Sequence, residues 1–324
     1  MPFDPDAAAA PGSGIYGLPF TPEQARVIIL PVPFEATTSY GGGTSAGPTA
    51  IFEASKQVDL FDHETGRPYE AGIAMLPIPR KIVSWNAKAK KLGRKHIKAV
   101  NAISTAVNEW VYAKAAGMLD DGKLVVTLGG DHSVPFGAMQ ACAEKYPGLG
   151  ILHLDAHADL RDSYEGFTFS HASIFHNVMT KIPGVAKLVQ VGVRDLGLAE
   201  NRMIEQSNGR IVTFFDPDLA RRKEAGVPFA KIADDIVRAL PRDVYLSWDI
   251  DGLDPTLCPG TGTPVPGGLS WNEAIALLRA VLRAKKRIVG LDLCEVAPGD
   301  SEWDANVGAR LLYKMIGFAL MTAR

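Results

Sequence analysis

Residues 152–159 (LHLDAHAD) place three side chains that can bind metals at every second position: Asp155, His157 and Asp159. The apolar residues before them are typical of a β-strand, and residues two apart in an extended chain point to the same side. The three side chains should therefore converge where the strand ends. Three such groups on one buried face would repel one another or stay unsatisfied without a cation. The stretch predicts a metal site if other segments bring further ligands to it.

Two more clusters of this kind follow apolar runs. Residues 124–128 lead into Gly129-Gly130-Asp131-His132-Ser133, and residues 244–250 lead from Asp249 to Asp251. The carboxyl ends of parallel strands meet at one edge of a sheet, so all three clusters can share a site. Six ligands rich in carboxylates suit two divalent ions that share a hydroxide. Nitrogen and oxygen donors without thiolate favour Mn²⁺, with Ni²⁺, Co²⁺ and Zn²⁺ left open. The predicted ligands are His132, Asp155, His157, Asp159, Asp249 and Asp251.

Short apolar, β-branched runs and helical patterns alternate along the chain, which predicts a parallel sheet between two layers of helices. No linker divides the chain, so we expect a single catalytic domain over residues 21–324 after a flexible Pro/Ala/Gly-rich arm over residues 1–20. The predicted strands cover residues 27–32, 124–128, 150–154, 188–193, 211–215, 244–250 and 288–293. The predicted helices cover residues 48–55, 87–116, 134–146, 229–240, 270–284 and 305–322.

The composition excludes several classes of protein. The net charge of −2 does not suggest a surface that binds nucleic acid. The basic run at residues 88–98 is interpreted as the solvated start of a helix. No apolar run has transmembrane length. The three cysteines are an odd number without a C-x-x-C pair, which argues against a disulfide framework and favours the cytoplasm.

The motifs GGDHS, DAHAD and SWDIDGLDP, in this order and spacing, resemble the ureohydrolase family of arginase, agmatinase and relatives. GTSAGP near residue 45, GTGTPVPGG from residue 260 and DLCEVAP from residue 292 extend the resemblance over essentially the whole chain. It implies a three-layer α/β/α fold around a parallel sheet of about eight strands. It also implies a binuclear manganese centre bound by the six ligands above, and assembly into homotrimers or homohexamers.

The resemblance also implies a reaction, in which a metal-bridging hydroxide attacks the carbon of a guanidinium group. Glu295 would pair with the guanidinium nitrogens, and His171 would transfer protons. We expect Asp159 to be a catalytic residue as well as a metal ligand. Thr263 is a candidate for supporting Glu295 or the substrate.

The substrate loops argue against arginase. Arginases hold the amino-acid end of arginine partly with an Asp in an R-D-V-D loop, and the matching position here is Gly197. The loops look more like those of bacterial agmatinases, so agmatine is the favoured substrate, cleaved to putrescine and urea. Guanidinobutyrate, with Arg161 as a candidate partner for its carboxylate, and guanidine stay open. Arginine, a formiminoglutamase or deacetylase-like activity on the same fold and a non-catalytic partner subunit are less favoured.

Overall fold

The structure is a computed structural model that describes residues 3–323. Met1 and Pro2, the first residues of the predicted arm, lie outside the described residues, as does Arg324. Within residues 3–323, no helix combines the length and the apolarity that crossing a membrane requires.

Eight strands form one sheet in the order β2-β1-β3-β8-β7-β4-β5-β6, and every neighbouring pair is parallel. The side chains of β1 and β4 are buried along their whole length, as expected for strands covered on both faces. The strands are β1 (Val27–Val32), β2 (Ile73–Met75), β3 (Leu124–Gly129), β4 (Leu149–Leu154), β5 (Val185–Val191), β6 (Ile211–Phe214), β7 (Asp243–Asp249) and β8 (Arg287–Cys294).

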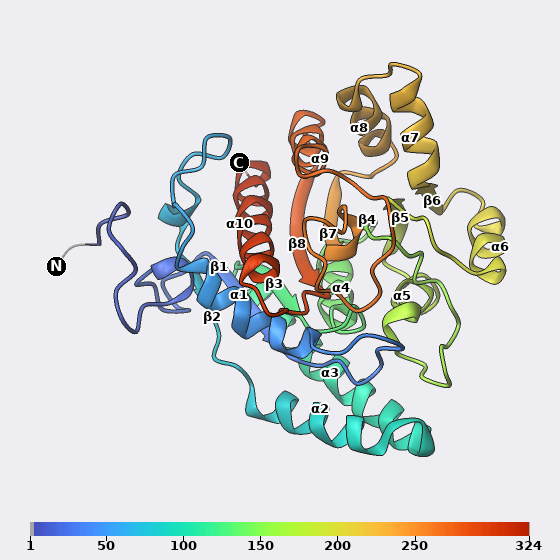
Figure 1. Cartoon of the computed structure of the whole chain (residues 1–324), viewed down its shortest axis with the longest axis horizontal. Helices are drawn as coiled ribbons and strands as arrows, with labels where there is room; N and C mark the ends of the chain where they lie inside the picture. The colour runs from blue at the N-terminus through green and yellow to red at the C-terminus, as the bar shows by residue number, and fades with distance from the viewer. Residues whose placement is uncertain (1–2, 324) are drawn as a thin grey trace.

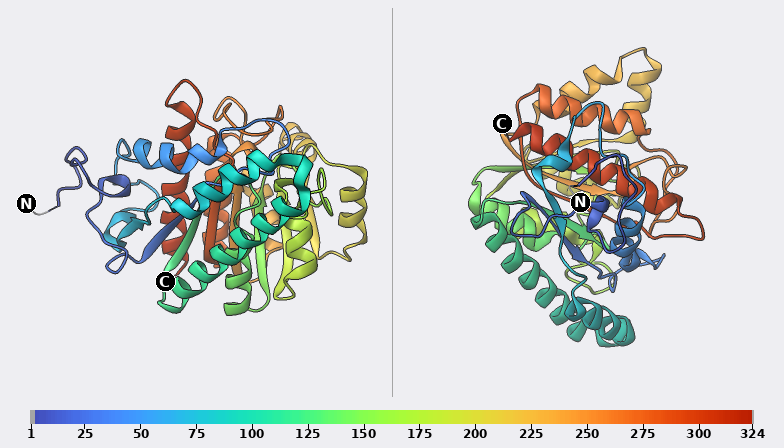
Figure 2. Two further views of the ribbon diagram at one scale, coloured as in Figure 1. Left: turned by 90° about the horizontal axis from the view of Figure 1, so that it is seen from below. Right: turned by 90° about the vertical axis from the view of Figure 1, so that its left-hand side faces the viewer.

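Helices cover both faces of the sheet, so the predicted three-layer α/β/α fold is confirmed (Figures 1 and 2). One hydrophobic core lies under α1 (Gly47–Ser55), α7 (Asp216–Glu224), α8 (Phe229–Arg238), α9 (Trp271–Arg283) and α10 (Trp303–Thr322). The other lies under α2 (Arg80–Leu92), α3 (Ile97–Asp120), α4 (Phe136–Lys145) and α5 (Ile174–Lys181), and α6 (Leu198–Gln206) packs beside the edge strand β6.

The order of the strands determines where a site can form. The central strands β3, β8, β7 and β4 are neighbours in the sheet although they are far apart in the sequence. The motifs GGDHS, DAHAD, SWDIDGLDP and DLCEVAP each lie at the end of one of these four strands. Their carboxyl ends therefore meet at one place on the edge of the sheet.

The structure differs from the sequence prediction in several elements. The single helix predicted over residues 87–116 is two helices, because Gly93 takes a positive φ of 53° that ends α2. Three helices and one strand were not predicted. The strand β2 has only three residues, and α7 (DPDLARRKE) buries only Leu219, so neither shows a clear apolar period.

The amino-terminal segment is less detached than an arm of twenty residues would be. Ile15, Tyr16 and Leu18 are buried in the core, and the Tyr16 hydroxyl donates to the carbonyl of Ala309 on α10. Further upstream, the ring of Phe3 lies 6.2 Å from that of Tyr69. The hydrophobic core therefore begins at Ile15, because the side chains of Ile15, Tyr16 and Leu18 pack near α1 and α10.

Candidate metal centre

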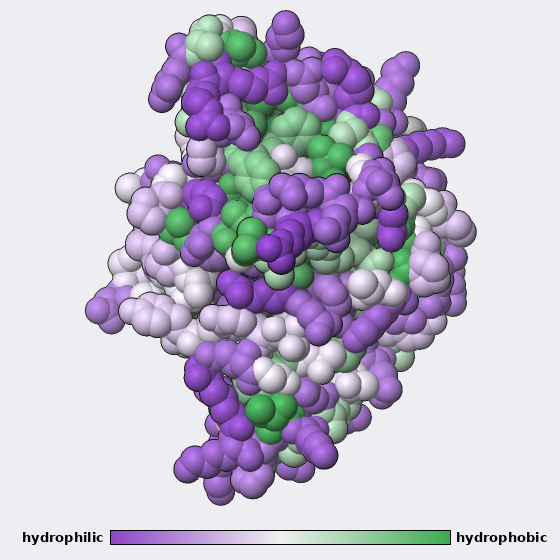
Figure 3. Space-filling model, turned by 90° about the vertical axis from the view of Figure 1, so that its right-hand side faces the viewer, coloured by the Kyte–Doolittle hydropathy of each residue, from purple (hydrophilic) through white to green (hydrophobic). Residues whose placement is uncertain are grey.

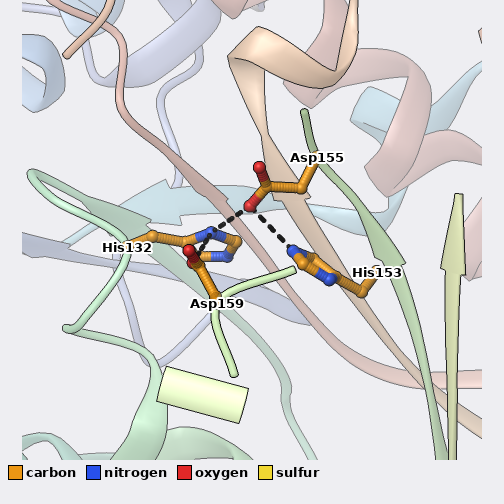
Figure 4. Close-up of side chains that lie close together, drawn as sticks. All are labelled: His132, His153, Asp155 and Asp159. Atoms are coloured by element: carbon orange, nitrogen blue, oxygen red, sulfur yellow. Dashed lines mark hydrogen bonds and ion pairs between the residues drawn. The ribbon is translucent and has the colours of Figure 1, made fainter. Parts of the chain in front are cut away.

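His132 is the point on which the first group of predicted ligands converges. Its Nδ1 lies 3.1 Å from Asp155 Oδ2, 3.5 Å from Asp159 Oδ2 and 3.4 Å from Asp249 Oδ2. These side chains come from the ends of β3, β4 and β7. Gly130 lets the backbone that leads to His132 pass close to Phe34, because a Cβ at residue 130 would lie only 2.2 Å from the carbonyl oxygen of Phe34. Figure 4 shows Asp155 and Asp159 facing the His132 ring.

A second group shares Asp155 with the first. His157 Nδ1 lies 3.3 Å from the other carboxylate oxygen of Asp155, Oδ1, and 3.2 Å from Asp251 Oδ2. The donor atoms of Asp155, His157 and Asp251 lie close enough together to hold one cation, and so do those of His132, Asp155 and Asp159. Asp155 thus presents one oxygen to each group. This arrangement suits two ions side by side.

The charges of the two groups support this interpretation. Burial and the charge of Asp155 raise the pKa of Asp159 to about 7. Burial, with the charges of Asp251 and Asp155, raises the pKa of Asp249 well above its ordinary value. Asp251 Oδ2 is buried and accepts no hydrogen bond from the described residues. Carboxylates crowded in this way are stabilised by cations, so the donor set fits two divalent ions.

His153 is a further residue of this site, beside the predicted ligands. Its Nε2 lies 2.8 Å from Asp155 Oδ2, and Figure 4 marks this contact with a dashed line. The amide of Gln190 donates to Nδ1 of His153, at 3.1 Å, and to the carbonyl of Ala158. Because Nδ1 accepts, Nε2 carries the proton and donates it to Asp155. His153 therefore orients Asp155, and its position two residues before Asp155 on the strand was the available signal.

Glu295 follows β8 and completes the floor of the site. Its Oε1 accepts a hydrogen bond of 2.9 Å from the backbone N–H of His132, whereas its buried Oε2 accepts none. Its φ of 66° is strained for a residue with a side chain. Burial, followed by the charges of Asp249 and Asp131, raises the pKa of Glu295 well above its ordinary value. A cation at Oε2 would stabilise the charged form of Glu295.

His171 lies beside Glu295, with its Nδ1 3.8 Å from Glu295 Oε1. Its Nε2 lies 3.2 Å from the hydroxyl of Ser39, and its backbone N–H donates to Thr37 Oγ1. Burial, together with the charge of His157, lowers the pKa of His171 to about 4, so the imidazole is neutral at pH 7. The contact with Ser39 joins loop segments far apart in the sequence, and no sequence pattern pointed to it.

Three of the predicted site residues, His157, Asp159 and His171, line a cavity of about 480 Å³ together with Thr263. Thr263 makes no hydrogen bond to Glu295 in the described structure. The preceding residue is the one that approaches, since a Cβ on Gly262 would lie 2.8 Å from Glu295 Oε2. The structure thus brings Thr263 to the cavity but not to Glu295.

A second cavity, of about 460 Å³, lies between α5 and α6 and is lined by His176, Arg202 and Met203 among others. Figure 3 views the molecule from the side that carries α6, where apolar patches lie among hydrophilic side chains. None of the predicted site residues lines this second cavity. The substrate is therefore expected in the first one.

Comparison with known proteins agrees with this geometry. Residues 25–317 match the arginase family. The chain is 38% identical over 307 residues to an N(1)-aminopropylagmatine ureohydrolase of Thermus thermophilus, covering 94% of both chains. It is 31% identical over 288 residues to an agmatinase of Bacillus anthracis, covering 85% of both. The fold is similar to that of proclavaminate amidino hydrolase from Streptomyces clavuligerus, with a TM-score of 0.76, 24% identity and coverage of 98% of this chain and 100% of that one.

Proposed function

The chain belongs to the arginase family and is a metal-dependent ureohydrolase of the agmatinase-like branch, and from that premise we propose that it hydrolyses a small guanidino compound with a cationic tail. Agmatine is the favoured substrate, with putrescine and urea as the products. The observation that carries the proposal is Glu295, whose Oε2 is a buried, unused acceptor next to the two ligand groups. A planar guanidinium is the cation whose paired N–H groups suit a carboxylate.

The metal ions would be held by the six predicted ligands, His132, Asp155, Asp159 and Asp249 on one side and His157 and Asp251 on the other, with Asp155 common to both groups. We propose Mn²⁺, with Ni²⁺ or Co²⁺ as alternatives. Bound divalent ions would lower the pKa of water and so supply a nucleophile at neutral pH.

The side chains of this chain would perform the remaining work. Glu295 would hold the guanidinium so that its carbon faces the ligand groups. A carbon–oxygen bond forms to the oxygen of water, and the bond between that carbon and the tail nitrogen breaks. The tail nitrogen gains a proton that the water gives up and leaves as an amine. His171 is placed to transfer that proton, since it lies beside Glu295 and lines the cavity.

A second candidate substrate is agmatine extended by an aminopropyl group. The reason is that a relative with 38% identity over nearly its whole length carries the name N(1)-aminopropylagmatine ureohydrolase. The cavity of about 480 Å³ is larger than a guanidinium group alone requires, so a longer tail is compatible with it.

A panel of urea-release assays tests the proposal. The protein is reconstituted with Mn²⁺, Ni²⁺ or Co²⁺ and given agmatine, N(1)-aminopropylagmatine, arginine, guanidinobutyrate or guanidine. We expect urea from the two cation-tailed compounds and two metal ions per chain by elemental analysis. Absence of urea from every compound with every metal would contradict the function. The matched control is Glu295→Gln, which should keep both ions but lose activity.

We also propose a homotrimer or homohexamer, as the resemblance to the family implies. Light scattering coupled to size exclusion measures the mass directly. A monomer at the concentration of the assay would contradict this.

A further inference from the structure

The guanidinium of Arg194 joins three separate loops through their backbones. Its N–H groups donate to the carbonyls of Gly192 (3.1 Å), Asp251 (2.7 Å), Leu253 (3.4 Å), Val265 (2.9 Å) and Pro266 (3.0 Å). The first of these carbonyls follows β5, the next two follow β7, and the last two belong to the glycine-rich segment 260–268. No carboxylate pairs with Arg194 in the part of the chain that the structure describes. The side chain therefore fastens backbone segments together instead of neutralising a charge.

Two of these contacts concern the second ligand group, His157 and Asp251. The backbone N–H of Arg194 donates to the carbonyl of Ala156, directly before His157, at 2.8 Å. The guanidinium donates to the carbonyl of Asp251 itself. Arg194 thus holds both segments from which His157 Nδ1 and Asp251 Oδ2 face each other at 3.2 Å.

The glycine-rich segment forms part of the cavity wall. Residues 263–265 line the cavity together with His157. Arg194 holds one end of this segment, and Asp304 holds the other, where its Oδ1 accepts from the N–H of Gly260 at 2.9 Å. Loss of the contacts of Arg194 would therefore release the wall at one end only.

The shape of the guanidinium is what suits these partners. Its five N–H donors lie in one plane and point in different directions, so one side chain reaches carbonyls on three segments. A lysine side chain keeps the positive charge, but its three donors all start from one nitrogen. Replacing the arginine by lysine therefore removes the shape without removing the charge.

We propose that Arg194 is a positioning residue that couples the wall of the substrate cavity to the ligand group formed by His157 and Asp251. A displaced Asp251 would bind its ion less tightly, because groups that orient metal ligands contribute to metal affinity. A displaced wall would bind the substrate less tightly. This inference rests on the proposed function, since it takes His157 and Asp251 as ligands, and it adds the residue that holds them against the wall.

The experiment compares Arg194→Lys with the unsubstituted protein. Equilibrium dialysis against Mn²⁺, followed by elemental analysis, measures the affinity for each ion. We expect one ion to bind as before and the dissociation constant of the other to rise about tenfold or more. With saturating Mn²⁺ and the best substrate of the urea-release panel, KM should rise about tenfold while kcat stays within about threefold, because binding is weakened without loss of a reacting group.

Arg210→Lys is the matched control. The Arg210 guanidinium also donates to backbone carbonyls, those of Val185 (3.0 Å) and Met179 (3.4 Å), but it lines the second cavity and not the first. This variant loses the same kind of contact away from the site, so KM and both metal affinities should stay within about twofold. If Arg194→Lys behaves like Arg210→Lys in both measurements, the role of Arg194 is overturned. Absence of urea from the unsubstituted protein would instead contradict the proposed function, and the metal measurement would still test Arg194.

Hydrogen exchange in the unsubstituted protein covers the case in which Arg194→Lys does not fold. Arg194 ties residues 251–253 to residues 265–266, so loading with Mn²⁺ should protect peptides over residues 249–254 and 263–269 together. Peptides over residues 205–211, which include Arg210, should not change. Protection of residues 249–254 without residues 263–269 would show that the ligand group and the wall are not coupled.

Discussion

The floor of the cavity and its rim are constructed differently. The floor consists of side chains that directly follow four adjacent strands, such as His132 after β3 and Glu295 after β8, and it is buried. The rim consists of side chains on loops, such as Ser39, Tyr40 and Arg161. Tyr40 is 88% exposed, whereas His132 is fully buried. Both regions line one site, but only the floor is part of the core.

The difference separates two tasks. The floor holds its groups by hydrogen bonds between neighbouring strand ends, for example from Glu295 N–H to the carbonyl of Gly130 and from His132 N–H to the carboxylate of Glu295. Such contacts leave little freedom, which suits groups that must bind ions and a planar cation. The rim can vary in side chain without disturbing the sheet. We infer that the floor sets the reaction and the rim sets the tail of the substrate.

The largest effect is expected from Asp155→Asn, a change in the floor. Asp155 is the one residue common to both ligand groups, and it also accepts from His153. An amide there removes a charge that two ions would share, so we expect loss of bound metal and a fall in kcat on the order of a thousandfold. Elemental analysis of the dialysed protein measures the first, and urea release measures the second.

If Asp155→Asn kept two ions per chain, the assignment of the shared ligand would be wrong. Asp162→Asn provides the comparison, since it removes a carboxylate from the same segment of chain outside the cavity. It should retain full metal content.

The same division explains what the sequence could predict. His132, Asp155 and Asp249 could be recognised because they follow apolar runs, and because strand ends in a parallel sheet meet at one edge. The rim could not be derived in this way. The contact between Ser39 and His171 depends on how two loops fold toward each other, and loops carry no period from which this could be read.

Two other features were missed for related reasons. The role of His153 depends on the hydrogen bond from Gln190, which lies on the neighbouring strand β5 and determines the tautomer. The helices α5 and α6 follow rim segments and are only eight and nine residues long, so their apolar patterns are too short to stand out. In contrast, the predicted and observed ends of β1 coincide, because its six residues are all apolar and buried.

An intermediate effect is expected from Ser39→Ala, which tests whether the rim contributes to the reaction as well as to the tail. The Ser39 hydroxyl is 3.2 Å from Nε2 of His171. Without it the imidazole is less well oriented, so we expect kcat to fall about tenfold while KM and metal content stay close to normal. Steady-state kinetics with agmatine measure both constants.

Ser39→Thr, which keeps the hydroxyl, should recover most of the rate. Ser45→Ala, on the same loop, should behave as the unsubstituted enzyme, since only the backbone of Ser45 makes a hydrogen bond to Glu35. A loss of kcat in Ser39→Thr as large as in Ser39→Ala would show that the hydroxyl does not position His171.

The smallest effect is expected from Glu35→Gln, which tests what holds the rim in place. Glu35 is 3% exposed, and its Oε2 accepts from the N–H groups of Gly43 (2.7 Å) and Ser45 (2.9 Å), while Oε1 pairs with Lys90. Burial opposes its ionisation, but the contacts with Lys90, Ser45 and Gly43 outweigh burial, and the pKa of Glu35 lies below its ordinary value. The charged form therefore stabilises the loop that carries Ser39 and Tyr40.

At pH 7 we expect Glu35→Gln to destabilise the fold by about 1–2 kcal/mol, a fall in Tm of about 2–6 °C.

The sign of the pH dependence distinguishes this contact from general damage. Because the pKa of Glu35 is lower in the folded chain, its contribution is complete above the unfolded value of about 4.3 and is lost as the pH falls through the folded value. The difference in Tm between Glu35→Gln and the unsubstituted protein should therefore be full at pH 7 and should shrink at pH values below about 4. Glu53→Gln is the control, because Glu53 pairs with Lys56 on an exposed part of α1 and should change Tm little at either pH. A difference that stayed constant down to the lowest pH would mean that packing, and not the charge of Glu35, holds the rim against the floor.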